Sequence, residues 1–413
     1  MNSGGRRASA SCRRLRARFE WPVFGALRPL VLHQMRRLAK VHFFHRQRVF
    51  SPLAVEYLLV YYEQDAATGR YDGAFANSPC SLAKTGVGRC AYTQSRRHSP
   101  IKIIRITIKR ENDMQIGFVG LGSMGAPMAK NLVAAGFDVT VFDLDAARMA
   151  GLQKVGARIA STLTELAADV DVLMTSLPGP KQSRLVMPPV LALLKSGALW
   201  IDLTTNDRAL VLELAGVAKA RGIDTLESPV TGAVDGARKG RLTLFVGGDA
   251  AVLERAGALF APLGKVIHCG ALGTGNVVKL VTNQIWFINA AAIGEALTLG
   301  VKGGVEPLTV WDALKQSVGD TFVCRHDVPS IFAGHYDPSF TLDLCCKDLD
   351  LLAGLGQDFA TDLPMTRAAH ERFREARNEY GGGAAELHVC KLIEEQAGIS
   401  LRVSGEWPIH SEA

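Results

Sequence analysis

The chain has 413 residues, of which 48% are hydrophobic, so it is long enough to bury a large core and to form two or more domains. Its formal net charge of +7 is divided unevenly: residues 1–113 contain 21 Lys and Arg against 7 Asp and Glu, whereas residues 114–413 contain 26 against 33. The basic character therefore belongs to the first 113 residues, and the acidic remainder is not typical of a nucleic-acid-binding protein.

The first 113 residues form a basic N-terminal extension. Residues 1–50 contain twelve Arg and Lys and a single acid, Glu20. We interpret residues 1–113 as disordered sequence, or as upstream sequence joined to a gene whose own start is Met114. One alternative is a transit peptide, which would direct the protein to the mitochondrial matrix instead of the cytoplasm, although such peptides are usually shorter and are followed at once by the domain. Another is an arm that binds nucleic acid.

Directly after Met114, an apolar strand is expected to lead into a glycine-rich turn. The residues of this turn are Gly120, Leu121, Gly122, Ser123, Met124 and Gly125. A helix over Ala126–Ala135 and a second strand over Asp138–Phe142 follow, and Asp143 closes the second strand. This order of strand, Gly-x-Gly-x-x-Gly, helix, strand and acid is the dinucleotide-binding fingerprint in its proper context.

Each part of this fingerprint has a physical reason. The first glycine allows the tight turn, the second lets the backbone approach a pyrophosphate, and the third lets helix and strand pack closely. The helix N-terminus offers free N–H groups to the phosphates. Asp143 lies 23 residues after Gly120, close to the roughly 20 expected for a carboxylate that binds ribose hydroxyls. Because this carboxylate repels a 2′-phosphate and no arginine follows before Arg148, NAD is favoured over NADP as the cofactor.

Apolar strands separated by helical segments continue to about residue 275. Strands are expected at residues 171–177, 197–202, 223–227, 242–247 and 265–269. Such alternation predicts a mostly parallel, doubly wound sheet covered by helices on both faces. The first three of these strands end in turns that lie where open α/β sheets bind ligands. We therefore predict an α/β Rossmann domain over residues 114–276.

From residue 277 onward the pattern is helical, punctuated by Pro and Gly. Val277–Gly300 is expected to be a long helix that is apolar nearly all round and therefore buried, with a partner subunit as one candidate neighbour. We predict an all-α domain over residues 277–405 that forms a dimer or tetramer. The eight cysteines include no CxxC pair, which favours reduced thiols and no metal site, and no stretch reaches the roughly 18 continuous apolar residues of a membrane span.

A second motif, Gly275-Asn276-x-x-Lys279-x-x-x-Asn283, opens the long helix. Asn276 is expected to cap the helix, and Lys279 and Asn283 lie one turn apart on the same face. Partial desolvation lowers the pKa of a lysine and suits it to proton transfer at an alcohol or carbonyl oxygen. Asn283 would then orient the lysine or a substrate hydroxyl. The alternative is a lysine whose stem lies on the helix while its ammonium reaches solvent.

A third motif contains Lys347 and Asp348 on a later helix. These two charges could reach back over the mouth of a cofactor site. They could equally be exposed helix charges that contribute little. The spacing alone leaves both interpretations open.

The three motifs together resemble the β-hydroxyacid dehydrogenase family, which includes 3-hydroxyisobutyrate dehydrogenase, tartronate semialdehyde reductase and the glyoxylate and succinic semialdehyde reductases. The resemblance covers about residues 114–400 and rests on ordered matches at residues 120–132, 202–205, 229–233, 275–279 and 347–349. It implies a Rossmann domain followed by a helical domain through which subunits dimerise.

The resemblance also implies roles at the reacting centre. Lys279 would be the general acid/base and Asn283 its helper. The substrate carboxylate would be bound by Thr231, Gly232 and Ala233, largely through backbone N–H groups. The family usually has Ser-Gly-Gly in this loop, so Ala233 adds a methyl group at a position where φ can be positive. That departure leaves the identity of the substrate open.

For the cofactor, the resemblance implies that Thr205 and Lys347 flank the nicotinamide end. Leu177 and Pro178 would lie against the adenosine half. Lys279 is kept, which argues against relatives that have lost it and serve as imine reductases or non-catalytic reader proteins. The sequence thus predicts an NAD-dependent dehydrogenase of a small β-hydroxy acid, 3-hydroxyisobutyrate-like. The alternatives are a semialdehyde reductase that uses NADP, and an NAD(P)-binding protein without turnover.

Overall fold

The computed structural model describes residues 114–407, and the interpretation of residues 1–113 lies outside these described residues. Nine strands within this part form one sheet in the order β3-β2-β1-β4-β5-β6-β8-β7, with β9 paired to β8. The strands are β1 (Gln115–Val119), β2 (Asp138–Phe142), β3 (Arg158–Ile159), β4 (Val172–Thr175), β5 (Leu199–Asp202), β6 (Asp224–Glu227), β7 (Val230–Thr231), β8 (Leu242–Gly247) and β9 (Gly264–Gly270).

The sheet is mostly parallel, as the sequence predicts. Only the pairs that β8 makes with β6 and β7 are antiparallel. The strand order reverses between β1 and β4, which both pair in parallel with their neighbours. This reversal is the switch point at which open α/β sheets bind ligands, just beyond the carboxyl ends of the strands.

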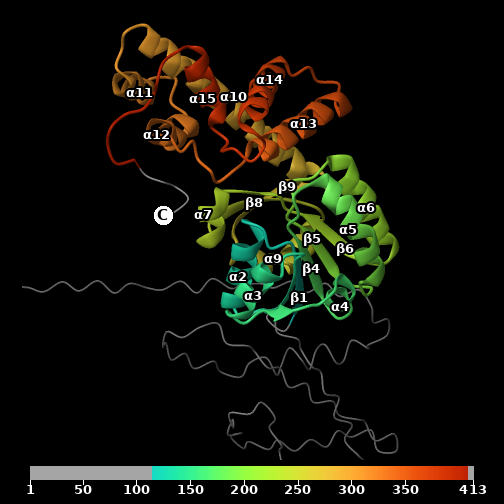
Figure 1. Cartoon of the computed structure of the whole chain (residues 1–413). Helices are drawn as coiled ribbons and strands as arrows, with labels where there is room; N and C mark the ends of the chain where they lie inside the picture. Colours follow the sequence, from blue (N-terminus) through green and yellow to red (C-terminus); the bar gives the residue numbers. More distant parts are fainter. Residues whose placement is uncertain (1–113, 408–413) are drawn as a thin grey trace, which may run out of the picture. The chain divides into compact units, whose positions relative to one another are not determined.

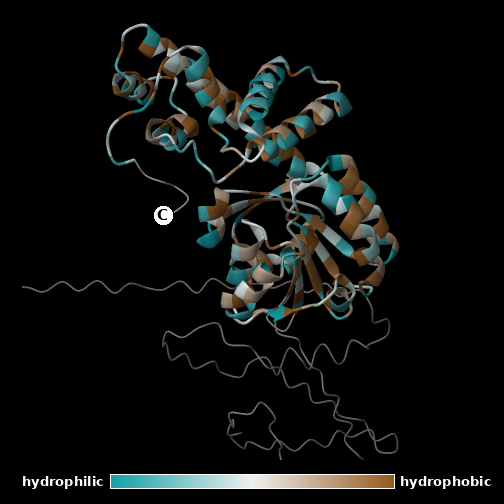
Figure 2. Ribbon diagram, viewed as in Figure 1, coloured by the Kyte–Doolittle hydropathy of each residue, from teal (hydrophilic) through white to brown (hydrophobic). Residues whose placement is uncertain are grey.

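Helices cover both faces of the sheet (Figure 1). They are α2 (Gly125–Ala134), α3 (Ala146–Gln153), α4 (Leu163–Ala167), α5 (Pro180–Leu193), α6 (Arg208–Ala220), α7 (Ala233–Arg238), α8 (Ala250–Arg255) and α9 (Gly257–Phe260). Side chains of β4 alternate between two cores: Met174 packs with α2 and α3, and Leu173 packs with α5 and α6. Burial on both faces explains why these strands are hydrophobic along their length (Figure 2).

The elements after β9 are helices. The elements are α10 (Thr274–Lys302), α11 (Pro307–Lys315), the π-helix η2 (Val323–Asp327), α12 (Val328–Ala333), α13 (Leu342–Asp358), α14 (Pro364–Tyr380) and α15 (His388–Gln396). They bury a core of their own that includes Phe287, Phe332 and Phe373. The last helix starts at His388, shortly after Ala385 pairs with Thr341 in an isolated β-bridge.

Helix α10 joins the two parts of the chain. It packs against α13, α14 and α15 and against strand β8. By length and hydropathy alone α10 could cross a membrane, but the core helix of a soluble protein passes the same test. Its burial is incomplete, since Val281, Ile285 and Leu299 are 46%, 56% and 74% exposed. The described chain therefore leaves one apolar stripe of α10 uncovered.

Candidate active site

The glycine turn lies between β1 and α2. Gly120 has a φ of +92°, and a side chain at Gly125 would overlap the carbonyl oxygen of Gly120, so neither position admits another residue without a shift. At Gly122, by contrast, an added Cβ meets nothing closer than the Arg148 guanidinium at 4.0 Å. Helix α2 has no side-chain cap at its N-terminus. Open space above Gly122 and an uncapped helix N-terminus fit a bound pyrophosphate.

Asp143 follows β2 and lies against this turn. Its Oδ2 accepts a hydrogen bond from the Leu121 N–H at 2.6 Å, and its Oδ1 accepts one from the Asp145 N–H at 2.9 Å. The Arg148 guanidinium is 3.8 Å from the same carboxylate. Asp143 therefore lies against the glycine turn, and its binding to ribose hydroxyls stays a prediction.

The loop after β4 carries two more of the predicted cofactor residues. The Leu177 N–H donates to Thr204 Oγ1 at 3.0 Å, and a Cβ on Gly120 would be 3.4 Å from Leu177 Cδ2. This places Leu177 beside the glycine turn. Pro178 is exposed, and Thr205, in the loop after β5, is half-buried.

A buried polar network follows the ends of the central strands. Asp202, at the end of β5, accepts hydrogen bonds from Thr175 Oγ1 at 2.9 Å and from Asn206 Nδ2 at 2.8 Å. The Asn206 N–H donates in turn to Asn276 Oδ1 on α10 at 2.7 Å. Burial raises the pKa of Asp202, and its hydrogen bonds lower it. The network ties the loop after β5 to the helix that carries Lys279.

The same network corrects the prediction that Asn276 caps α10. The N-cap residue is Gly273, and Asn276 lies inside the first turn. Glu227, at the end of β6, accepts the Gly275 N–H at 2.9 Å and a hydrogen bond from the Asn276 side chain. A carboxylate from the sheet thus satisfies the free N–H groups of the helix. Burial raises the pKa of Glu227, opposed first by the hydrogen bond from Asn276.

Lys279 and Asn283 lie five and nine residues after Thr274, the first residue of α10. Asn283 Nδ2 donates to Asp348 Oδ2 at 2.7 Å, and Lys347 Nζ is 2.7 Å from Asp348 Oδ1. Burial lowers the pKa of Lys279 below its ordinary value, and the charge of Asp348 partly opposes that shift. A lysine in this setting is suited to take or give a proton.

The Lys347-Asp348 motif had two interpretations. The one that makes both residues exposed helix charges is wrong for Asp348, because its side chain is buried. Lys347 also reaches the sheet, because a Cβ built on Gly179 would be 2.9 Å from Lys347 Cδ. Lys347 therefore lies over the loop after β4, next to Leu177 and Pro178. The structure brings α10, α13 and this loop together around one carboxylate.

The predicted substrate loop lies between β7 and α7. Gly232 has a φ of +123° and Ala233 a φ of +54°, so the alanine does occupy a left-handed position, at a cost of roughly 1 kcal/mol. A cavity of about 370 Å³ lies beside this loop, between α7, the glycine turn and residues 338–339; its lining includes Ser123, Val234 and Ser339. In residues 114–407 no hydrogen bond joins the loop to Lys279, and the roles of these residues stay predictions.

A larger cavity, of about 460 Å³, lies between α13 and α14 and is lined by Leu349, Thr366 and His370 among others. None of the predicted site residues lines it. The sequence assigned no role to two acids of this site, Asp202 and Glu227. A signal for both was available, since acids at the ends of successive parallel strands meet at one edge of the sheet.

Two protein families match the described part of the chain. Residues 115–273 match the family described as the NAD binding domain of 6-phosphogluconate dehydrogenase. Residues 273–393 match the family described as NAD-binding of NADP-dependent 3-hydroxyisobutyrate dehydrogenase. The chain thus carries NAD(P)-binding domains over most of the described part.

Among individual proteins, the chain is 35% identical to 2-(hydroxymethyl)glutarate dehydrogenase of Eubacterium barkeri over 70% of this chain and 98% of that protein. It is 32% identical to mitochondrial 3-hydroxyisobutyrate dehydrogenase of Mus musculus over 71% and 92%. A solved structure of Mycobacterium tuberculosis 3-hydroxyisobutyrate dehydrogenase with L-serine matches with a TM-score of 0.64 and 29% identity, covering 68% of this chain and 99% of the other.

Proposed function

Because the chain belongs to the β-hydroxyacid dehydrogenase family, we propose that it oxidises a small β-hydroxy acid with a nicotinamide cofactor. The observation that carries this proposal is the cluster of Lys279, Asn283, Lys347 and Asp348 beside the loop after β4. The cluster supplies a desolvated base next to the place where the strand ends receive a dinucleotide.

In the proposed reaction, uncharged Lys279 takes the proton from the substrate hydroxyl. A bound nicotinamide would supply the acceptor for a hydride from the carbon that bears this hydroxyl, so the alcohol would lose two electrons and two hydrogens and become an aldehyde. Asn283, held by Asp348, orients the hydroxyl or the lysine. Backbone N–H groups of Thr231, Gly232 and Ala233 bind the substrate carboxylate. In the reverse reaction the protonated lysine gives its proton to the aldehyde oxygen, and the reduced cofactor would supply the hydride to the carbon.

A panel of β-hydroxy acids and the corresponding semialdehydes tests this proposal. The expected result is formation of NADH from a small β-hydroxy acid, and its consumption with the matching semialdehyde. A chain that binds the cofactor but turns over no member of the panel in either direction would instead be a binding protein.

We further propose that NAD is preferred over NADP. Asp143 lies against the glycine turn, which supports this preference, because a 2′-phosphate bound beside the turn would meet its negative charge. Replacing Asp143 by Ala is expected to lower the ratio of kcat/KM for NAD to kcat/KM for NADP by ~10-fold or more, because Arg148 would lose this carboxylate partner. Asp138→Ala, which removes an exposed ion pair with Arg158, is the control. A parent enzyme that turns over faster with NADP would contradict the preference.

The exposed apolar stripe of α10 supports a second proposal about assembly. Val281 and Ile285 lie about one turn apart, and Leu299 continues the exposed side near the other end of the helix. We propose that a second copy of this chain covers the stripe.

Ile285→Glu is expected to lower the mass in solution measured by light scattering, because it buries a charge in the interface. Leu185→Glu, at a more exposed position on α5 (69% against 56%), should leave the mass unchanged. An identical mass for the parent and Ile285→Glu would contradict the proposal.

A further inference from the structure

Three polar side chains lie along one face of the first part of α10. Asn276, Lys279 and Asn283 are spaced by three and four residues, which places them one above the other on the same side of a helix. Asn276 and Asn283 are both buried. Lys279 therefore lies between two buried amide side chains, each about one turn away.

Each of these amides is held by a buried carboxylate from another element. Asn283 Nδ2 donates to Asp348 Oδ2 on α13 at 2.7 Å. Asn276 Nδ2 donates to Glu227 Oε2 at the end of β6. Both acids are buried. The two pairs thus fasten α10 before and after Lys279, the first pair to the sheet and the second to the helical part of the chain.

Glu227 uses both of its oxygens as acceptors. Its Oε1 accepts the Gly275 N–H at 2.9 Å, and its Oε2 accepts the Asn276 N–H at 3.4 Å in addition to the side-chain amide. A side chain at Gly275 would overlap the carbonyl oxygen of Phe245 on β8. The start of α10 therefore packs directly on the sheet, and Glu227 fixes the rotation of its first turn.

From Asn276 a chain of hydrogen bonds continues to the loops after β5 and β4. Asn276 Oδ1 accepts the Asn206 N–H at 2.7 Å, and Asn206 Nδ2 donates to Asp202 Oδ2 at 2.8 Å. Asp202 Oδ1 accepts the Thr204 N–H at 3.2 Å. Thr204 Oγ1 accepts the Leu177 N–H at 3.0 Å. The chain therefore ends on the loops that carry predicted cofactor residues.

The second pair also leads to the loop after β4. Asp348 Oδ1 is 2.7 Å from Lys347 Nζ, and a Cβ built on Gly179 of this loop would be 2.9 Å from Lys347 Cδ. Both asparagine–carboxylate pairs thus connect α10 with the loops that a dinucleotide is expected to contact. Lys279 lies on the segment of α10 between the two connections.

We propose that Glu227 and Asn276 are positioning residues for Lys279, which align the lysine with a bound cofactor through the loop after β5. The inference rests on the proposed function. The two residues act through the helix, and Lys279 remains the residue that handles the proton. Alignment matters because a displacement of ~1 Å can lower the rate of a reaction between bound groups by ~10²-fold.

The direction of the hydrogen bonds allows a test with changes that keep the size of the side chains. Both oxygens of Glu227 face N–H donors, so the new NH₂ group of Glu227→Gln faces a donor in either orientation of its amide. Turning the Asn276 amide round does not help, because its NH₂ group would then face the Asn206 N–H. Adding Asn276→Asp supplies an acceptor on both sides and restores the chain.

Glu227→Gln is expected to lower kcat for the β-hydroxy acid by ~10-fold or more, because Lys279 loses its alignment. The KM for the acid and the Kd for NAD should change by less than ~3-fold, since neither residue contacts a ligand. The double variant Glu227→Gln/Asn276→Asp should return kcat to within ~3-fold of the parent. Steady-state kinetics and a binding titration give these quantities.

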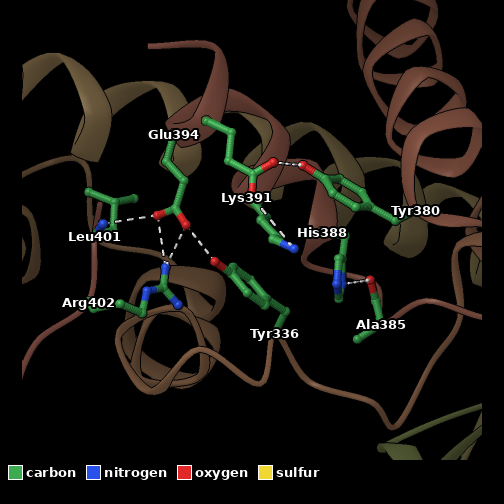
Figure 3. Close-up of polar contacts among 9 residues, drawn as sticks. Tyr336, Tyr380, Ala385, His388, Lys391, Glu394, Leu401 and Arg402 are labelled. Carbon is green, nitrogen blue, oxygen red and sulfur yellow. Dashed lines mark hydrogen bonds and ion pairs between the residues drawn. The ribbon is translucent and has the colours of Figure 1, made fainter. Parts of the chain in front are cut away.

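Glu394→Gln is the matched control. Glu394 on α15 is also buried and also accepts hydrogen bonds with both oxygens. Its donors are Tyr336, Leu401 and Arg402, none of which is a predicted site residue (Figure 3). The control should therefore lower the melting temperature, as loss of a buried hydrogen bond does, and keep the kcat of the parent.

Amide hydrogen exchange tests the same connection in the parent protein. Saturating NAD should slow exchange over residues 275–283 as well as over residues 176–179 and 203–206, because the chain of hydrogen bonds joins these segments. This measurement needs no variant. It applies together with the double variant if Glu227→Gln does not fold.

Four results would overturn the inference. They are a parent-like kcat in Glu227→Gln, an equal loss of kcat in Glu394→Gln, a folded double variant that stays as slow as Glu227→Gln, and exchange that NAD slows in the two loops but not over residues 275–283. A parent that turns over no acid of the panel would instead count against the proposed function, and the exchange experiment would still decide whether the cofactor loops and α10 are connected.

Discussion

Replacement of Lys279 by methionine is expected to lower kcat/KM for the β-hydroxy acid by ~10²–10⁴-fold, the usual contribution of a general acid/base. Methionine keeps the length and apolar stem of the side chain and removes the group that takes the hydroxyl proton. Cofactor binding should persist, because the glycine turn and Asp143 lie on other elements. The measurements are steady-state kinetics with the acid and a fluorescence titration with NADH.

Lys302→Met is the matched control, since it makes the same change at the exposed C-terminal end of the same helix. Its kcat/KM should equal that of the parent. A Lys279→Met protein that turns over at the parent rate would remove Lys279 from the mechanism.

The pH profile gives a second readout of the same residue. Burial lowers the pKa of Lys279 from its ordinary 10.5, so the uncharged base forms at a lower pH than in a free lysine. Oxidation needs the uncharged form, and kcat/KM should therefore rise with pH and level off below pH 10.5. Reduction needs the protonated form and should fall over the same interval. The rise of kcat/KM with pH should be absent in Lys279→Met. A rise in the parent whose midpoint lies at or above pH 10.5 would show that Lys279 is not desolvated.

The glycine turn gives the other large expected effect. Gly122→Ala should leave the melting temperature unchanged, because the added methyl meets nothing closer than 4.0 Å in the protein. It should nevertheless raise the Kd for NAD by ~10-fold or more, about 1.4 kcal/mol, because the methyl occupies the space of the pyrophosphate. Thermal unfolding and a binding titration measure the two quantities separately.

Gly125→Ala, in contrast, is expected to lower the stability of the protein. Its methyl would overlap the Gly120 carbonyl oxygen, so the variant is expected to lose about 1–3 kcal/mol of stability, as overpacked sites do. Gly151→Ala on α3, where an added Cβ meets nothing within 4 Å, should change neither stability nor binding. Parent-like NAD affinity in Gly122→Ala would mean that the pyrophosphate does not lie on this turn.

Local sequence patterns were sufficient to predict much of the fold. The expected strands at Asp138–Phe142 and Leu242–Gly247 coincide with β2 and β8, because hydrophobic runs bounded by turn residues define short buried strands. The long helix was expected from residue 277 and begins at Thr274. Strands β3 and β7 were missed, since two residues are too few to show a period.

The site depended on contacts that no local pattern contains. Asn276 is a residue type that often caps helices. Here Glu227, 49 residues earlier, accepts the N–H groups of the helix, and the side chain of Asn276 accepts the Asn206 N–H instead. For Asp348 the spacing left an exposed charge and a site residue equally open, and the hydrogen bond from Asn283 across α10 and α13 excludes the exposed charge. The positive φ of Ala233, in contrast, was foreseen from its place in a loop where the family keeps glycine.

The central claim is that a hydride leaves the hydroxyl-bearing carbon of a β-hydroxy acid while Lys279 takes the proton. The most direct test is to oxidise 3-hydroxyisobutyrate or L-serine, deuterated at that carbon, and to follow the label by NMR. We predict that deuterium appears at one face of C4 of the reduced nicotinamide, with a primary isotope effect on kcat/KM that Lys279→Met does not abolish. Label that is recovered only in solvent, or no reduced cofactor at all, would contradict the account.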